Sequence, residues 1–200
     1  GPRAPGGPFN EDLMHWTIDR PPPIWVRTDE DVRKLKEKLE HCSLVAFHTE
    51  TTNLHPTQDN IFFWSASTVD DRYFLQRRHL ELFRRVLEEK GRTWIGTNTK
   101  FDAQMMAIAG IRMRGDWFCT VVMDRMYDCD QLHGLKEVYE REFQEHVLRF
   151  EEVFYPRDKR SKPKKPPGKE MHEVLMAAWD SRPQDVIDYA SLDAWMSYQV

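Results

Sequence analysis

The sequence predicts an α/β fold, with one mixed sheet covered by helices. The chain has 200 residues, 40% of them hydrophobic and 31% charged, which suits a single domain with one sizeable core. Short apolar runs bounded by turn residues predict strands, and longer amphipathic runs predict helices. The predicted order is three strands, a helix, a strand and then mostly helices, which is typical of a mixed sheet with helices on it.

The N-terminal residues are expected to stand apart from the domain. Residues 1–7, "GPRAPGG", resemble the scar of a removed tag, and they are left out of the fold prediction. The tract "IDRPPPIWV" predicts an extended leading segment, because its three prolines prevent a helix and offer no backbone donors. We therefore expect residues 1–23 to be scar and leading segment, and residues 24–200 to form one domain.

The first half of the domain predicts one helix and three strands. Thr28 is the expected N-cap of a helix that reaches about Cys42, and acidic residues 29–31 fill the first turn, where the helix dipole favours them. Strands follow at residues 43–49, 60–68 and 72–76, the last two paired through the turn at 69–71.

The second half predicts mainly helices. A helix over residues 78–91 is closed by Gly91, and a strand over 92–97 leads to a helix that Gly110 ends. Further helices are expected at about 119–128, at about 134–144, and from Arg182-Pro183 onward. The stretch "RDKRSKPKKPPGK" has seven basic residues, one acidic residue and three prolines, which predicts a mobile loop at about 155–170. This loop either steers a phosphate backbone or is simply a solvated loop.

Polar residues stand out where the strand at 43–49 ends. His48 and Glu50 are two residues apart, so both side chains point to one face of the strand while Thr49 points to the other. In open α/β sheets, functional sites collect at strand ends. A cap or turn contact is the simpler structural explanation.

Two further polar pairs lie at helices. Asn98 and Asp102 frame a strand-to-helix junction, where Asn98 can cap the helix and the dipole favours the charge of Asp102. Tyr189 and Asp193 are four residues apart on the last helix and share a face. A hydrogen-bonded pair or a solvated face is the structural alternative for these two.

The order of these segments resembles the DEDD superfamily of 3′–5′ exonucleases, in its tyrosine-bearing (DEDDy) branch. That branch includes the proofreading domain of family-A DNA polymerases and the RNase D-like nucleases. "VAFHTETTNL" is similar to the first motif (DxE), "NTKFD" to the second (NxxxD) and "YASLD" to the third (YxxxD), within residues 24–200. "LHGLKEVYEREF" resembles the "hGLK" segment between the second and third motifs. The resemblance implies a ribonuclease H-like fold in three layers, a central mixed sheet flanked by helices.

The resemblance also implies a metal-dependent catalytic site. In such nucleases four carboxylates hold two divalent cations that clamp the scissile phosphate. Glu50, Asp102 and Asp193 match three of these positions, and Tyr189 matches the residue that orients the attacking water. We expect these residues, together with His48, to be catalytic, and the three acids and His48 to hold the metal.

Three more residues are expected to bind the substrate. Thr51 and Leu54 fall where members of this family contact the terminal nucleotide, with Leu54 as an apolar wedge under the last base. Stacking on such a base tolerates any sequence, which suits a proofreading enzyme. Asn98, the first residue of the second motif, completes this group.

His48 departs from the family pattern, because it occupies the position of the first aspartate. A neutral imidazole has no negative charge and cannot bridge two ions as a carboxylate does. We expect two divalent cations, Mg²⁺ or Mn²⁺, with Mn²⁺ or a single metal favoured by the nitrogen ligand. Three explanations of His48 stay open: a natural ligand, a degenerate nuclease that still holds DNA or packs against a polymerase, or an engineered substitution.

The predicted function is the proofreading 3′–5′ exonuclease module of a DNA polymerase, of cellular or phage origin, acting on single-stranded DNA 3′ ends. One alternative is a pseudo-exonuclease that serves as a binding or structural module. A second is an RNase D-like or helicase-linked exonuclease. The last segment keeps its helical periodicity to the final residue, so we expect a C-terminal polymerase domain to follow in the parent chain.

Composition also predicts which partners and which cell compartment suit the protein. A net charge of −4 attracts no nucleic acid by itself, so metal ions or local patches must do so. No apolar stretch approaches the roughly 18 residues of a membrane span, and we expect a monomer without membrane contact. Three cysteines without CxxC spacing favour a reducing compartment. That is the cytoplasm of a bacterial or phage-infected cell, or the nucleus or an organelle in a eukaryote.

Overall fold

A computed structural model of the chain describes residues 20–52, 57, 60–155 and 168–200, and the structural statements below concern these residues. Leu54 and most of the predicted basic loop lie outside them. None of the described helices has the length and apolar character needed to span a bilayer. The elements in chain order are β1 (Ile24–Trp25), α1 (Asp29–Glu40), β2 (Leu44–Thr51), β3 (Ile61–Ser67), β4 (Arg72–Gln76), the 3₁₀ helix η2 (Arg77–Phe83), α2 (Arg84–Leu87), β5 (Thr93–Gly96), α3 (Thr99–Ile108), β6 (Asp116–Cys119), α4 (Thr120–Tyr127), α5 (Leu135–Phe143), α6 (Phe150–Phe154), α7 (Gly168–Ser181) and α8 (Pro183–Gln199).

The strands form one mixed sheet in the order β1-β4-β3-β2-β5-β6. Strand β3 runs antiparallel to β2 and β4. The other three pairs are parallel, and they join β1 to β4, β2 to β5 and β5 to β6. The pairing of β2 with β5 covers Leu44 to Ala46 only. The second half of β2 therefore runs past the end of β5 and has no strand partner on that side.

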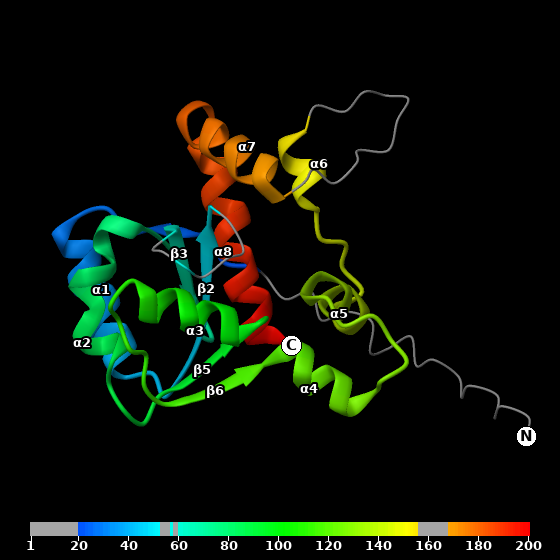
Figure 1. Ribbon diagram of the computed structural model, residues 1–200, viewed down its shortest axis with the longest axis horizontal. Coiled ribbons are helices and arrows are strands. Elements are labelled where there is room, and N and C mark those ends of the chain that lie inside the picture. Colours follow the sequence, from blue (N-terminus) through cyan, green and yellow to red (C-terminus); the bar gives the residue numbers. More distant parts are fainter. Residues whose placement is uncertain (1–19, 53–56, 58–59, 156–167) are drawn as a thin grey trace, which may run out of the picture.

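Helices cover both faces of this sheet. On β3, Trp64 packs into a buried cluster with residues of α1, η2, α2 and α3, while its neighbour Phe63 packs with residues of α6, α7 and α8. Successive strand residues point to opposite faces, so the sheet lies between two helical layers. Figure 1 shows α1 and α2 on one side of the strands and α8 along the other. This confirms the predicted three-layer α/β fold.

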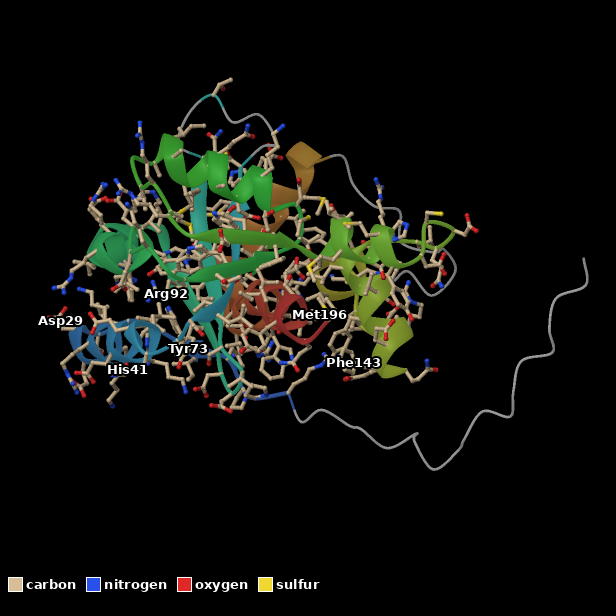
Figure 2. All side chains as sticks on the ribbon, turned by 90° about the horizontal axis from the view of Figure 1, so that it is seen from below. Asp29, His41, Tyr73, Arg92, Phe143 and Met196 are labelled. Atoms are coloured by element: carbon tan, nitrogen blue, oxygen red, sulfur yellow. The ribbon has the colours of Figure 1, made fainter. Side chains whose placement is uncertain are left out.

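A third buried cluster joins α5 to the C-terminal half of α8. It contains Leu135 and Tyr139 of α5 with Trp195 and Met196 of α8, and Phe143 packs against it. In Figure 2, Phe143 and Met196 lie near one another, away from Asp29 of α1 and from His41, the C-cap of that helix. This cluster fixes α5 against the helix that carries the third sequence motif.

Local signals placed several helix boundaries correctly. Thr28 caps α1 with a capping box, since its hydroxyl accepts from the Asp31 N–H at 3.1 Å and its own N–H donates to the Asp31 carboxylate at 2.9 Å. The helix ends at Glu40, two residues before the predicted end. Pro183 opens α8, as predicted.

The continuous helix predicted over residues 78–91 is wrong. The segment forms a 3₁₀ helix followed by α2, which ends at Leu87. Its buried residues Leu80, Phe83 and Val86 are three apart, a spacing that fits three residues per turn as well as the α-helical period. Arg92 donates a hydrogen bond to the carbonyl of Val86 and so satisfies a carbonyl at the helix end.

Two short elements and the start of α7 also differ from the prediction. Strand β6 was not predicted, because it has only four residues at the sheet edge and no buried side chain. The short helix α6 was not predicted either. The basic loop was expected to reach about residue 170, but α7 already begins at Gly168. The apolar residues Met171, Leu175 and Ala178 pack at helical spacing in the core and extend the helix into that stretch.

Candidate active site

The end of β2 places His48 and Glu50 on one side of the strand. His48 Nε2 lies 3.7 Å from Glu50 Oε1, as the spacing of two predicted. The buried Thr49 points the other way. The register with β3 shifts between Glu50 and Thr51, so the regular strand is disturbed directly after the acidic residue. Such irregularities re-aim side chains next to functional sites.

Asp102 reaches this strand end from the first turn of α3. It is only 1% exposed, and its Oδ1 accepts hydrogen bonds from the N–H of Thr49 at 2.8 Å and from the Thr49 hydroxyl at 2.7 Å. The N–H of Thr49 is available because β2 has no strand partner on that side. Gly96 allows the close approach of β5, since a Cβ there would lie 2.8 Å from the carbonyl oxygen of Phe47.

Asn98 turns the chain from β5 into α3. Its backbone is left-handed, with φ 58° and ψ 44°, a conformation that asparagine tolerates better than most residues. It occupies the N-cap position, but its side chain makes no capping hydrogen bond, so the predicted capping role is wrong. The side chain is exposed and stays available for other contacts.

The last helix brings Tyr189 and Asp193 to the same place. The flanking residues Val186, Ile187 and Ala190 are buried against the sheet, and this fixes the rotation of α8. Asp193 Oδ2 lies 3.6 Å from His48 Nε2. Within the described chain, Asp193 Oδ1 is buried and has no hydrogen-bond partner.

His48 stands at the centre of the cluster. Its Nε2 faces Glu50 and Asp193, and its Nδ1 lies 3.8 Å from Asp102 Oδ1. These separations are longer than hydrogen bonds, so the side chains lie close together but do not satisfy one another's hydrogen-bonding groups. Ligand atoms of His48, Glu50 and Asp193 all lie within 4.8 Å of one another. Residues from three distant segments thus converge on one point.

Burial and mutual repulsion shift the protonation of this cluster. Burial, helped by the charge of Asp193, raises the pKa of Glu50 to about 7, although His48 opposes the shift. Burial by itself would lower the pKa of His48, but the charges of Asp102, Glu50 and Asp193 outweigh it and raise that pKa. Burial also raises the pKa of Asp102. His48, Glu50 and Asp102 therefore hold protons more tightly than free side chains do.

The Tyr189 phenol stays protonated, because burial and the nearby charges of Asp193 and Glu50 raise its pKa. Its ring packs edge-on against Phe150 and Phe154, with centroids 5.7 and 5.3 Å away. Lys136 Nζ donates a hydrogen bond to the Tyr189 hydroxyl at 3.3 Å. Sequence reasoning assigned no role to Lys136, although the "hGLK" resemblance included it.

A pocket of about 340 Å³ opens beside Tyr189 and Asp193. It combines acidic, basic and apolar side chains from α5 to α8, which suits a ligand with both charged and apolar parts. Its lining residues are Leu135, Lys136, Glu137, Arg149, Phe150, Glu151, Met171, Tyr189 and Asp193.

Residues 23–200 match the family model described as "3′-5′ exonuclease", so the chain belongs to that family. Exonuclease domains of this kind usually bind divalent metals, and the cluster of His48, Glu50 and Asp193 has the ligand types for such an ion. The buried Asp193 Oδ1 fits this assignment, because a cation would satisfy an oxygen that no described residue satisfies.

Several solved structures share the fold of this chain. The EXO domain of Aedes aegypti Nibbler matches with a TM-score of 0.61 and 12% identity, over 90% of this chain and 86% of that one. Brucella melitensis NrnC matches with a TM-score of 0.54 and 22% identity, over 80% and 70%. Escherichia coli RNase D, an exoribonuclease involved in structured RNA processing, matches with a TM-score of 0.52 and 12% identity, over 88% and 50%. No curated protein sequence matches the chain. These likenesses establish the ribonuclease H-like fold.

Proposed function

We propose that the domain is a metal-dependent 3′–5′ exonuclease of the tyrosine-bearing type, which hydrolyses the terminal phosphodiester of single-stranded nucleic acid. The convergence of Glu50, Asp102 and Asp193 on the ring nitrogens of His48 carries this proposal, together with the buried Asp193 Oδ1, which finds no hydrogen-bond partner among the described residues. In it, Tyr189 orients the attacking water through its protonated phenol.

His48, Glu50 and Asp193 are the proposed ligands of a divalent cation. Asp102 Oδ1 already accepts two hydrogen bonds from Thr49 and lies 3.8 Å from His48 Nδ1. In this proposal Asp102 stays outside the ligand set and orients the metal-binding histidine. We therefore favour a single cation, or Mn²⁺ in place of Mg²⁺, because imidazole nitrogen suits Mn²⁺ better. When bound, such a cation supplies charge stabilisation of the phosphate and lowers the pKa of a bound water.

The proposed substrate is a single-stranded DNA 3′ end, and the proposed setting is a proofreading domain beside a polymerase domain. In this proposal Thr51, Leu54 and Asn98 contact the terminal nucleotide. RNA is the second candidate substrate, favoured by the fold likeness to E. coli RNase D, an exoribonuclease. A module that binds nucleic acid without cleaving it is the third, since His48 replaces an expected carboxylate.

The test uses single-stranded DNA and RNA of equal length, labelled at the 5′ end, with Mn²⁺ or Mg²⁺. Wild type should shorten a strand stepwise from its 3′ end, and Asp193→Ala should lower the rate at least about 100-fold, because it removes a metal ligand. Asp185→Ala is the matched control, since Asp185 is a half-exposed aspartate in the first turn of the same helix that pairs with Arg182, and its loss should leave the rate unchanged.

The outcomes separate the three candidates. Cleavage of DNA supports the proofreading assignment, and cleavage of RNA alone supports the RNase D-like one. If wild type retains labelled strands on a filter but shortens neither, the domain is a binding module and the proposed hydrolysis is wrong.

A further inference from the structure

Lys136 is a cation in the pocket that the proposed function leaves without a role. It is the second residue of α5 and is half-buried. Its Nζ donates to the carbonyl of Leu148 at 3.1 Å and to the hydroxyl of Tyr189 at 3.3 Å. The same Nζ lies 4.4 Å from the centroid of the Tyr189 ring. Two separate contacts thus join Lys136 to this tyrosine.

The other cation of the pocket is used differently. Arg149 pairs with Glu137 at 3.3 Å and with Glu140 at 2.9 Å. In the described part of the chain, Lys136 forms no ion pair with a carboxylate, and only two partners are found for its three N–H donors. Even half-buried, an ammonium without a paired acid costs free energy, so a purely structural role explains Lys136 poorly.

Packing holds Lys136 in its place beside Tyr189. Its neighbour Leu135 and the buried Tyr139 one turn later pack into the cluster shared with Trp195 of α8. Tyr189 is fixed on the other side by the rings of Phe150 and Phe154. The contact therefore joins two rigid helices and is not a chance meeting of surface side chains.

We propose that Lys136 is a positioning residue for Tyr189, an inference that rests on the proposed exonuclease function. An ammonium can only donate, so the Tyr189 oxygen is the acceptor in their hydrogen bond. The phenol hydrogen must then point away from Lys136, and Lys136, Tyr189 and Asp193 line one pocket. Lys136 thereby presents the phenol as a donor to the water or phosphate oxygen beside Asp193.

A double-mutant cycle tests this role in the full chain, with the substrate and cation that support cleavage by wild type. Lys136→Met should lower kcat roughly 10- to 100-fold with little change in KM, because the phenol is misplaced and substrate binding is not. In a Tyr189→Phe background, Lys136→Met should have no further effect. Lys136→Arg should restore part of kcat, and Lys34→Met controls for the loss of one positive charge.

An NMR spectrum detects the contact between Lys136 and Tyr189 independently of cleavage. With ¹³C-labelled tyrosine rings, the Tyr189 resonance, assigned by its loss in Tyr189→Phe, should shift in Lys136→Met and stay in place in Lys34→Met. If that resonance does not move, or if the two kcat effects multiply in the double variant, Lys136 does not act through Tyr189. If wild type cleaves no strand, the exonuclease proposal itself fails and this role fails with it.

Discussion

Arg92 and the active-site cluster both hold charged side chains away from solvent, and the two are built differently. Arg92 is 4% exposed, and its guanidinium donates to the backbone carbonyls of Leu39, Cys42 and Val86 and to the carboxylate of Glu89. It thus ties the ends of α1 and α2 to the start of β5. Figure 2 shows Arg92 close to α1.

The polar side chains of the active-site cluster are not fully hydrogen-bonded in this way. Asp193 Oδ1 has no partner in the described chain, and the three acids lie 3.6 to 3.8 Å from the nitrogens of His48. A buried polar group that is paired supports the fold, whereas one that is unpaired costs free energy until a ligand satisfies it. The difference in pairing therefore indicates a structural role at Arg92 and a binding role at the cluster.

Loss of Arg92 should have the largest effect on stability. Arg92→Met removes the guanidinium hydrogen bonds to three backbone carbonyls and to the Glu89 carboxylate, so the free energy of unfolding should fall by about 3 kcal/mol or more. Urea titration followed by circular dichroism measures the change. Arg33→Met is the control, because Arg33 lies exposed on α1, and it should leave the midpoint nearly unchanged. Equal midpoints for the two variants would contradict the structural assignment of Arg92.

Loss of the Glu50 charge should raise the stability of the folded domain, whereas loss of Arg92 should lower it. The folded state raises the pKa of Glu50 from 4.5 to about 7, so it binds a proton more tightly than the unfolded state does. Without metal, the stability of wild type should therefore fall as the pH rises from about 4.5 to about 7, by on the order of 2 kcal/mol. The stability of Glu50→Gln should change much less over the same pH range, because glutamine does not ionise.

Thermal melts of wild type and Glu50→Gln, in chelator across this pH range, measure that difference. The variant should melt at the higher temperature at pH 8, and the two should converge near pH 4.5. A wild type that stays the more stable protein at pH 8 would show that the cluster is satisfied internally.

Of the substitutions of Arg92, Glu50 and His48, that of His48 should have the smallest effect. It tests whether the histidine limits the use of Mg²⁺ at the proposed metal site. His48→Asp restores a fourth carboxylate, so Mg²⁺-supported cleavage should rise about tenfold, because Mg²⁺ prefers oxygen ligands. The measurement compares the variant with wild type in Mg²⁺ and in Mn²⁺. If His48→Asp leaves cleavage unchanged while Asp193→Ala abolishes it, our explanation of the histidine is wrong.

Sequence reasoning succeeded where a local rule decides the structure. The period of two along β2 put His48 and Glu50 on one side, and the N-cap residue Thr28 marked the start of α1. It failed where competing local structures have similar energies. The segment at 78–91 satisfies both the 3₁₀ and the α period, and Asn98 adopts a left-handed turn in place of a side-chain cap.

The sequence by itself determined which chemical groups the domain carries, their order along the chain and the face of the strand or helix on which each lies. Only the tertiary structure decided that Thr49 holds Asp102 and that Lys136 holds Tyr189, each pair being 53 residues apart. Such contacts depend on which strands pair, where β5 ends beside β2 and how α5 packs on α8. These are properties of the whole packed chain, because no short segment can bury its apolar face alone.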